Sequence, residues 1–165
     1  MQITINILLK KPKLGILFGL LFCLSQNLPM FSQDKLRGIT VTLSQIASSY
    51  SLDSPIELVF SVSNGHKEEQ AICKYMTPIE GFYGSFLIVK NAAGERIPYK
   101  GILVKREAPK KESYLPLSPG EILTHQFVLT EAYPIEKKGV YTVQFKGSQY
   151  LNGLPDSEIL EITVE

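Results

Sequence analysis

The sequence contains no tryptophan, only two cysteines and only two histidines among its 165 residues. Hydrolytic zinc sites of the H-E-x-x-H type need two histidines one helical turn apart, with a glutamate between them as general base. Neither His66, in NGHKEEQ, nor His125, in LTHQFVL, begins such a motif. His125 has no second His, Cys or paired carboxylate near it in the sequence and is expected in the core or at its boundary. We therefore expect no catalysis, no metal and no other cofactor.

An excess of charge of one sign is also missing. The chain has 17 basic and 16 acidic residues, and three of the basic ones are Lys10, Lys11 and Lys13 at the N-terminus. Without these three lysines, 14 basic residues stand against 16 acidic ones, a formal balance of −2. A protein that binds a polyanion concentrates basic charge on one face. Nucleic acid is therefore not an expected partner.

An apolar stretch at 14–24 follows the three lysines and is itself followed by polar and helix-breaking residues. It is shorter than the roughly 20 residues that a bilayer span requires, and the pattern is typical of a signal peptide. Cleavage after Ser25 would leave small residues at the two positions that matter. Lipidation at Cys23 is the alternative, although Phe22 is a poor neighbour for it. We expect a secreted or periplasmic protein without a transmembrane segment, with a signal peptide at 1–25, a linker at 26–36 and one domain at 37–165.

Removal of Cys23 with the signal peptide would leave Cys73 without a partner, so no intrachain disulfide is expected. Cys73 alternates with Ala71 and Tyr75 in a predicted strand. A small buried hydrophobic residue is the simplest interpretation, and a reactive or intermolecular thiol is the alternative.

Hydrophobic residues recur at every second position along the predicted domain, as in Ile39, Val41 and Leu43, and no segment shows a sustained helical period. Such alternation is typical of strands with one buried face. Seven or eight strands separated by turn residues predict a sandwich of two antiparallel sheets. The predicted strands lie near residues 39–43, 56–62, 70–76, 85–90, 96–104, 121–129, 139–146 and 158–164.

Turn residues sharpen this prediction. The segment 91–94 suits a tight hairpin in which Gly94 supplies a positive φ. Pro98 cannot donate to a ladder, so we expect the 96–104 strand at a sheet margin or interrupted by a bulge at Gly101. Tyr141 is placed as in a tyrosine corner, and Val143 stands where an immunoglobulin domain has a cysteine. The predicted fold is therefore an all-β, immunoglobulin-like antiparallel sandwich without a disulfide.

The run from residue 77 to 121 carries several motifs in a specific order. With these motifs the chain resembles the β-sandwich domain that precedes the catalytic domain in bacterial members of the deuterolysin and peptidyl-Lys metalloendopeptidase (aspzincin) family. The protease part of that family is absent here, and the resemblance implies a prosegment-like domain standing alone. The matched pieces are Thr77-Pro78 with Glu80-Gly81, Pro98-Tyr99-x-Gly101, Lys105-Arg106, Pro109, Tyr114, Leu117 and Pro119-Gly120-Glu121.

The resemblance places a protein-binding surface on the loop at 77–84 and on the basic segment at 100–111. Two simpler interpretations stay open: Phe82 or Tyr83 covers the end of the sandwich, and the basic residues belong to a solvated loop. The functional alternative is complementarity to the acidic cleft of a lysine-preferring protease. The candidate partner-binding residues are Thr77, Glu80, Phe82, Tyr83, Tyr99, Lys105 and Arg106.

These observations favour an exported, non-catalytic protein-binding module. Its expected partner is a protein such as a secreted metalloprotease, for which the domain would serve as an inhibitor or prosegment-like regulator. The alternative is a structural or adhesion-like cell-surface domain with no protease connection. The oligomeric state stays open, because an exposed sheet edge can pair with another copy or with an extended peptide.

Overall fold

The computed structural model describes residue 36, residues 38–148 and residues 151–165. The predicted signal peptide and most of the predicted linker lie outside these residues. The described part confirms the all-β prediction, because its regular structure consists of strands and three short 3-10 helices. No helix in this part is long and apolar enough to span a membrane. The strands are β1 (Ile39–Gln45), β2 (Glu57–Asn64), β3 (Gln70–Cys73), β4 (Leu87–Asn91), β5 (Tyr114–Leu117), β6 (Ile122–Val128), β7 (Gly139–Phe145) and β8 (Leu160–Val164), and the helices are η1 (Pro78–Glu80), η2 (Lys111–Ser113) and η3 (Leu129–Glu131).

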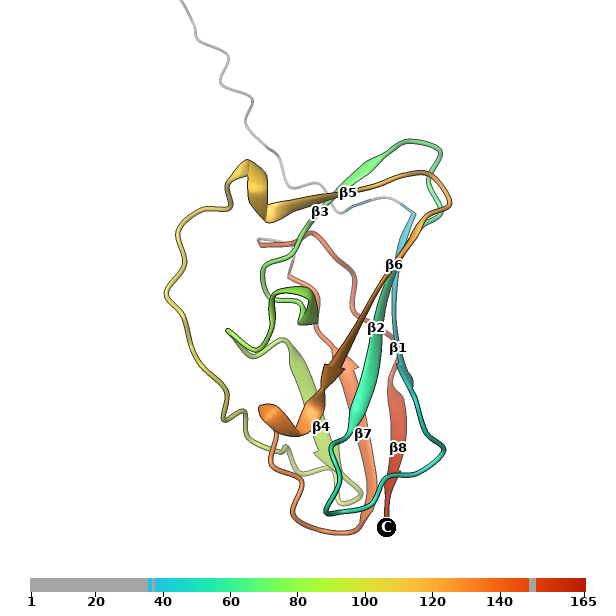
Figure 1. The fold of residues 1–165 in the computed structure, drawn as a ribbon, viewed down its shortest axis with the longest axis vertical. Coiled ribbons are helices and arrows are strands. Elements are labelled where there is room, and N and C mark those ends of the chain that lie inside the picture. Colours follow the sequence, from blue (N-terminus) through green and yellow to red (C-terminus); the bar gives the residue numbers. More distant parts are fainter. Residues whose placement is uncertain (1–35, 37, 149–150) are drawn as a thin grey trace, which may run out of the picture. The chain divides into compact units, whose positions relative to one another are not determined.

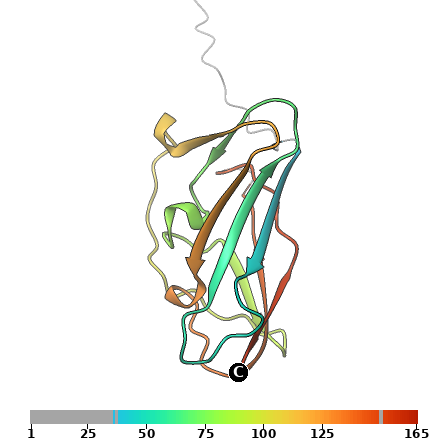
Figure 2. The same cartoon turned by 45° about the vertical axis from the view of Figure 1, so that its right-hand side comes forward.

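Two three-stranded antiparallel sheets form the sandwich, one in the order β1-β2-β6 and the other in the order β4-β7-β8 (Figures 1 and 2). These orders correspond to the A-B-E and C-F-G strands of an immunoglobulin domain. Tyr50, just after β1, also forms a parallel bridge with Val164 of the opposite sheet. Strands β3 and β5 make a separate antiparallel ribbon. The immunoglobulin-like sandwich is thus confirmed by the strand order itself.

The core lies between the inner faces of the two sheets. Every second side chain of β2 is buried, which follows from the period of two in its sequence. Phe60 of β2 meets Phe145 of β7 with ring centroids 5.0 Å apart, and Val143 is fully buried. No disulfide forms among the described residues, where Cys73 is free and buried. Apolar contact therefore connects the sheets where an immunoglobulin domain has a disulfide.

The hairpin after β4 is confirmed. Gly94 has a φ of 79°, and the side-chain oxygen of Asn91 accepts hydrogen bonds from the amides of Ala93 and Glu95. The returning chain pairs with β4 only briefly, through a bridge between Lys90 and Arg96. Gly94 therefore supplies the positive φ that the sequence predicts, and an Asx-type turn at Asn91 helps to close the connection.

The predicted strand at 96–104 is wrong. The Ile97 amide donates to Val89 of β4 at 2.9 Å, but Pro98 has no N–H to continue the ladder. The Lys100 amide donates to Ala132 instead, at 2.8 Å, and the chain leaves the sheet. It then runs as a long irregular segment up to η2 (Figure 1). Proline ends the pairing here, whereas the prediction had placed it inside an edge strand.

Strand β5 was not predicted, and it forms the second edge of the ribbon with β3, pairing Ala71 with Pro116. The predicted tyrosine corner is confirmed, because the Tyr141 hydroxyl donates to the backbone carbonyl of Lys137 at 2.7 Å. This bond connects the start of β7 to the loop before it.

Candidate functional site

The loop at 77–84 and the irregular segment at 99–106 lie against each other on one side of the sandwich. The Tyr99 hydroxyl lies 2.8 Å from the carbonyl oxygen of Phe82 and can donate to it. The Val104 amide donates to the Tyr83 carbonyl at 3.3 Å. Arg106 forms an ion pair with Glu80 at 2.6 Å. These three links join five of the seven predicted site residues in one cluster. Thr77 lies in the same loop as the N-cap of η1, and Lys105 lies beside the cluster as an exposed residue.

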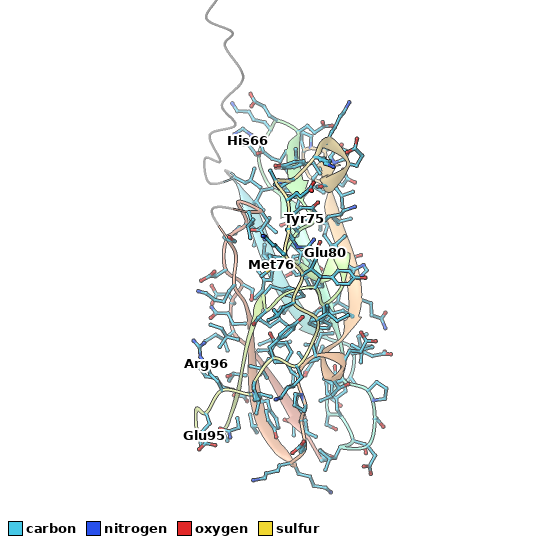
Figure 3. All side chains as sticks on the ribbon, turned by 90° about the vertical axis from the view of Figure 1, so that its left-hand side faces the viewer. His66, Tyr75, Met76, Glu80, Glu95 and Arg96 are labelled. Atoms are coloured by element: carbon cyan, nitrogen blue, oxygen red, sulfur yellow. The ribbon has the colours of Figure 1, made fainter. Side chains whose placement is uncertain are left out.

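The beginning of the 77–84 loop is held in an unusual backbone conformation. Met76 has a φ of 55°, in the left-handed region that non-glycine residues rarely occupy. Its amide donates to the Glu80 carboxylate at 2.6 Å, and the buried Thr77 hydroxyl donates to the Lys74 carbonyl at 2.6 Å. A Cβ on Gly84 would collide with the Met76 sulfur. Strain of this kind persists only where the surroundings fix the backbone. Figure 3 shows Tyr75, Met76 and Glu80 on the side that faces the irregular segment.

Asn152, from the segment between β7 and β8, fixes the same turn from the inside. Its side-chain amide donates to the carbonyls of Tyr75 and Met76 at 3.1 and 3.3 Å. Its side-chain oxygen accepts hydrogen bonds from the amides of Ser148 and Leu154. Asn152 is 4% exposed, so its side-chain amide has lost its contacts with water, and these partners satisfy its hydrogen-bonding groups instead.

The Glu80–Arg106 pair is withdrawn from solvent, with side chains 6% and 17% exposed. The guanidinium carbon of Arg106 lies 4.5 Å from the ring centroid of Tyr75 and 5.9 Å from that of Tyr83. Burial raises the pKa of the Glu80 carboxyl, and the Met76 amide and the Arg106 charge offset this rise only in part. The Arg106 Nε is buried with no hydrogen-bond partner among the described residues. Arg106 therefore anchors the irregular segment to the loop, and its charge faces Glu80 instead of solvent.

Phe82 covers the end of the sandwich. It stacks on Phe86 with centroids 5.3 Å apart and meets Phe127 and Tyr133 edge-on, at 5.9 and 6.1 Å. Tyr99 packs beside it, and a Cβ on Gly101 would collide with the Tyr99 phenol. Tyr83, in contrast, is 45% exposed. The two aromatic residues of this loop thus have different environments: Phe82 packs on the core, while Tyr83 offers its ring to solvent.

Three consecutive apolar residues that the sequence reasoning missed project from this cluster. Ile102, Leu103 and Val104 are 63%, 77% and 46% exposed, and Lys105 continues the exposure. We call Ile102–Lys105 the exposed run. The sequence signal for this surface is an apolar triplet between Pro98 and Pro109 with a lysine on each side. The same triplet fits the strand predicted at 96–104, so its exposure is not evident from the sequence.

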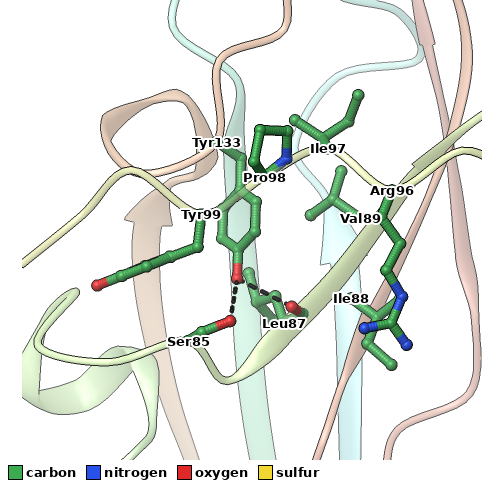
Figure 4. A pocket seen from close by; sticks show the side chains of 9 residues that line it. All are labelled: Ser85, Leu87, Ile88, Val89, Arg96, Ile97, Pro98, Tyr99 and Tyr133. Atoms are coloured by element: carbon green, nitrogen blue, oxygen red, sulfur yellow. Dashed lines mark hydrogen bonds between the residues drawn. The ribbon is translucent and has the colours of Figure 1, made fainter. Parts of the chain in front are cut away.

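A shallow hollow of about 180 Å³ lies next to the cluster, between β4 and the segment at 96–99 (Figure 4). The Tyr133 hydroxyl donates to the Leu87 carbonyl at 2.9 Å and lies 3.3 Å from the Ser85 hydroxyl. Burial raises the pKa of the Tyr133 phenol, which keeps it a donor. Because these polar groups already bond to each other, the hollow offers no free recognition group at Tyr133.

Elsewhere in the described part of the chain, His66 accepts a hydrogen bond from the Glu68 amide at 3.2 Å, and His125 lies half-buried in β6 opposite Phe60. No group of three or more His, Cys, Asp or Glu side chains that could hold a metal ion occurs among the described residues. Burial raises the pKa of the Cys73 thiol and keeps it protonated.

No family model and no curated protein matches this sequence. Among solved structures, the chain is similar over 77% of its length to β-glucosidase EmGH1 from Erythrobacter marinus, at 14% identity and a TM-score of 0.42. It is similar over 77% of its length to a β-glucosidase from Listeria innocua, at 13% identity and a TM-score of 0.40. The chain spans only 15% and 16% of these two enzymes. A CARDB domain from Pyrococcus furiosus, solved with di-metal ions, is similar over 77% of this chain and 87% of its own length, at 12% identity and a TM-score of 0.37. At these identities and TM-scores, none of the likenesses carries an argument about function.

Proposed function

We propose that this protein is an exported, non-catalytic protein-binding module that docks through the exposed run and the neighbouring Tyr83. The observation that carries the proposal is the concentration of apolar surface at one place. Seven large hydrophobic residues are exposed in the described part of the chain, and four of them are Tyr83 and the three apolar residues of the exposed run. Contiguous apolar area with a polar rim is typical of a surface that another protein covers.

The support beneath this surface favours docking over a freely moving loop. The Tyr99 hydroxyl, the Val104 amide and the Arg106 guanidinium each connect the segment to the 77–84 loop. That loop is in turn fixed by Glu80 and Asn152. A segment held in place before binding loses less conformational entropy when a partner covers it.

The partner we propose is a secreted endopeptidase of the metalloprotease type, which the module inhibits or regulates in the manner of a prosegment. The resemblance of the sequence motifs to those of the domain that precedes aspzincin proteases supports this partner. The lysines near the exposed run support it as well, because cationic residues around an apolar centre complement an acidic cleft. The export pattern at the N-terminus would place the module in the same compartment as such an enzyme.

Inhibition of a purified aspzincin metalloendopeptidase is the direct test. We expect the mature module to inhibit peptide hydrolysis at micromolar concentration and to bind the enzyme in surface plasmon resonance. The variant Ile122→Ser is a matched control, because it removes an equally exposed apolar residue from β6, at 63% exposure. Absence of both binding and inhibition would refute the proposal and leave a structural or adhesion-like role.

A further inference from the structure

We propose that the exposed run enters the substrate cleft of the partner endopeptidase as a substrate-like segment, with Lys105 in the acidic pocket that recognises a lysine. The apolar residues Ile102, Leu103 and Val104 would fill the neighbouring subsites. This inference rests on the proposed function and specifies which part of the module occupies which part of the enzyme.

The structure distinguishes Lys105 from Arg106, which the sequence motif presents as a pair. Arg106 already faces Glu80 at 2.6 Å and Tyr75 at 4.5 Å, so its guanidinium is not free to enter another pocket. Lys105 is exposed, and no carboxylate of the described residues forms an ion pair with it. Lysine carries a compact charge on a long flexible stem that can reach into a deep pocket. Lys105 is therefore the side chain of this pair that can be recognised.

Most of the backbone amides of the exposed run are also free to be recognised. Within the described residues, the amides of Ile102, Leu103 and Lys105 donate no backbone hydrogen bond, and the Val104 amide makes only the 3.3 Å bond to Tyr83. A cleft that receives an extended chain binds it through main-chain hydrogen bonds and selects it through pockets for the side chains. Unpaired backbone amides next to exposed apolar side chains supply both kinds of contact.

Contacts on either side of the run hold it in place, and such restraint distinguishes an inhibitor from an ordinary substrate. Before the run, the Tyr99 hydroxyl lies 2.8 Å from the Phe82 carbonyl and 2.9 Å from the Ile102 carbonyl. After it, Arg106 is held by Glu80. These contacts oppose the distortion and separation of chain ends that hydrolysis requires, so the segment should occupy the cleft and be cleaved slowly.

Two other occupants fit the exposed run less well. An anionic membrane would favour a basic protein, whereas the chain without its three N-terminal lysines has a formal balance of −2, and Glu107 and Glu112 lie among the nearby lysines. A second copy packed symmetrically on the exposed run would bring Lys105 of one copy towards Lys105 of the other, and like charges repel.

The experiment compares four mature proteins as inhibitors of a purified lysine-specific aspzincin metalloendopeptidase that hydrolyses a fluorogenic lysyl peptide. They are the unchanged protein, Lys105→Ala, the triple variant with serine at 102–104, and Lys138→Ala as the control for an exposed lysine outside the predicted binding surface. We expect competitive inhibition by the unchanged protein. The inhibition constant should rise at least about 10-fold for Lys105→Ala and for the triple variant, the size of a central interface contact, and less than about 2-fold for Lys138→Ala. Mass spectrometry should find the unchanged protein largely intact after an hour with the enzyme.

The outcomes separate this inference from the proposed function. An inhibition constant that does not change in Lys105→Ala, or inhibition that is not competitive, overturns the inference but not the proposal that the protein is a binding module. Rapid cleavage next to Lys105 without inhibition also overturns it, because the run is then only a substrate. No binding by the unchanged protein refutes both proposals. If the enzyme is not bound and the protein floats with phosphatidylglycerol vesicles in a manner that depends on residues 102–104, the run binds a membrane. If the protein instead sediments as a dimer that depends on these residues, the run binds a second copy.

Discussion

Replacing Arg106 by alanine should destabilise the domain strongly, because it leaves the Glu80 carboxylate buried without its counter-ion. Removing one partner of a buried ion pair costs about 3–5 kcal/mol. Arg106 is 17% exposed, and an unpaired Glu80 can take up a proton, so part of this cost is relieved. The lost contact with the Tyr75 ring adds about 0.5–1 kcal/mol. We expect Arg106→Ala to lower the free energy of unfolding by about 2–4 kcal/mol.

Urea unfolding followed by far-ultraviolet circular dichroism measures this loss, since the chain has no tryptophan to report its fold by fluorescence. In thermal unfolding, a loss of 3 kcal/mol in a domain of this size corresponds to a drop in Tm of roughly 10 °C. Lys105→Ala is the matched control. It removes the adjacent exposed charge and should change stability by less than about 0.5 kcal/mol.

A double-mutant cycle with Glu80→Ala attributes the effect to the pair. If the two charges stabilise each other, the double variant should be less destabilised than the sum of the two single variants. A loss below 1 kcal/mol for Arg106→Ala, or strictly additive effects, would show that the pair does not hold the irregular segment to the 77–84 loop.

Two further predictions concern titration and reactivity. Burial raises the pKa of Glu80 above its ordinary value of 4.5. At a pH just above that value, the folded protein therefore binds a proton at Glu80 that the unfolded chain does not bind. The stability of the unchanged protein should fall as the pH rises through this range. Urea midpoints between pH 4 and 7 should show this fall for the unchanged protein and not for Glu80→Gln. If the unchanged protein instead becomes more stable relative to Glu80→Gln as the pH rises, the predicted direction of the pKa shift is wrong. Cys73 is 1% exposed with a raised pKa, so Ellman's reagent should label it only after unfolding, and rapid stoichiometric labelling of the folded mature protein would show an accessible thiol.

The alternation of apolar residues was sufficient to predict the sandwich, because a period of two fixes which side of each strand is buried. The failures lie where local signals compete. The segment at 96–104 has the composition of a strand, but Pro98 and the turn around Gly101 separate it from β4. Strand β5, which the alternation did not reveal, contains Pro116, and a proline is tolerated at the edge of a two-stranded ribbon.

The candidate site shows a similar division. The motif residues directed attention to two loops, and the structure brings those loops into contact through Glu80 and Arg106. Sequence alone could not show that neighbouring Lys105 and Arg106 have opposite environments, because burial of Arg106 depends on Tyr75 and Glu80, which lie far away in the chain. The exposure of residues 102–104 was missed for the same reason. An apolar triplet usually indicates burial, and here no other segment of the described part of the chain packs over it.

The hydrogen bonds from Asn152 to Tyr75 and Met76 span 77 and 76 positions of the chain. Contacts this distant form late when a protein emerges from the ribosome, because the earlier half must wait for the later half to be synthesised. The turn beneath the docking surface can therefore reach its final shape only after the connection between β7 and β8 has been made. A nascent or C-terminally shortened chain would carry the exposed run before it is competent to hold a partner.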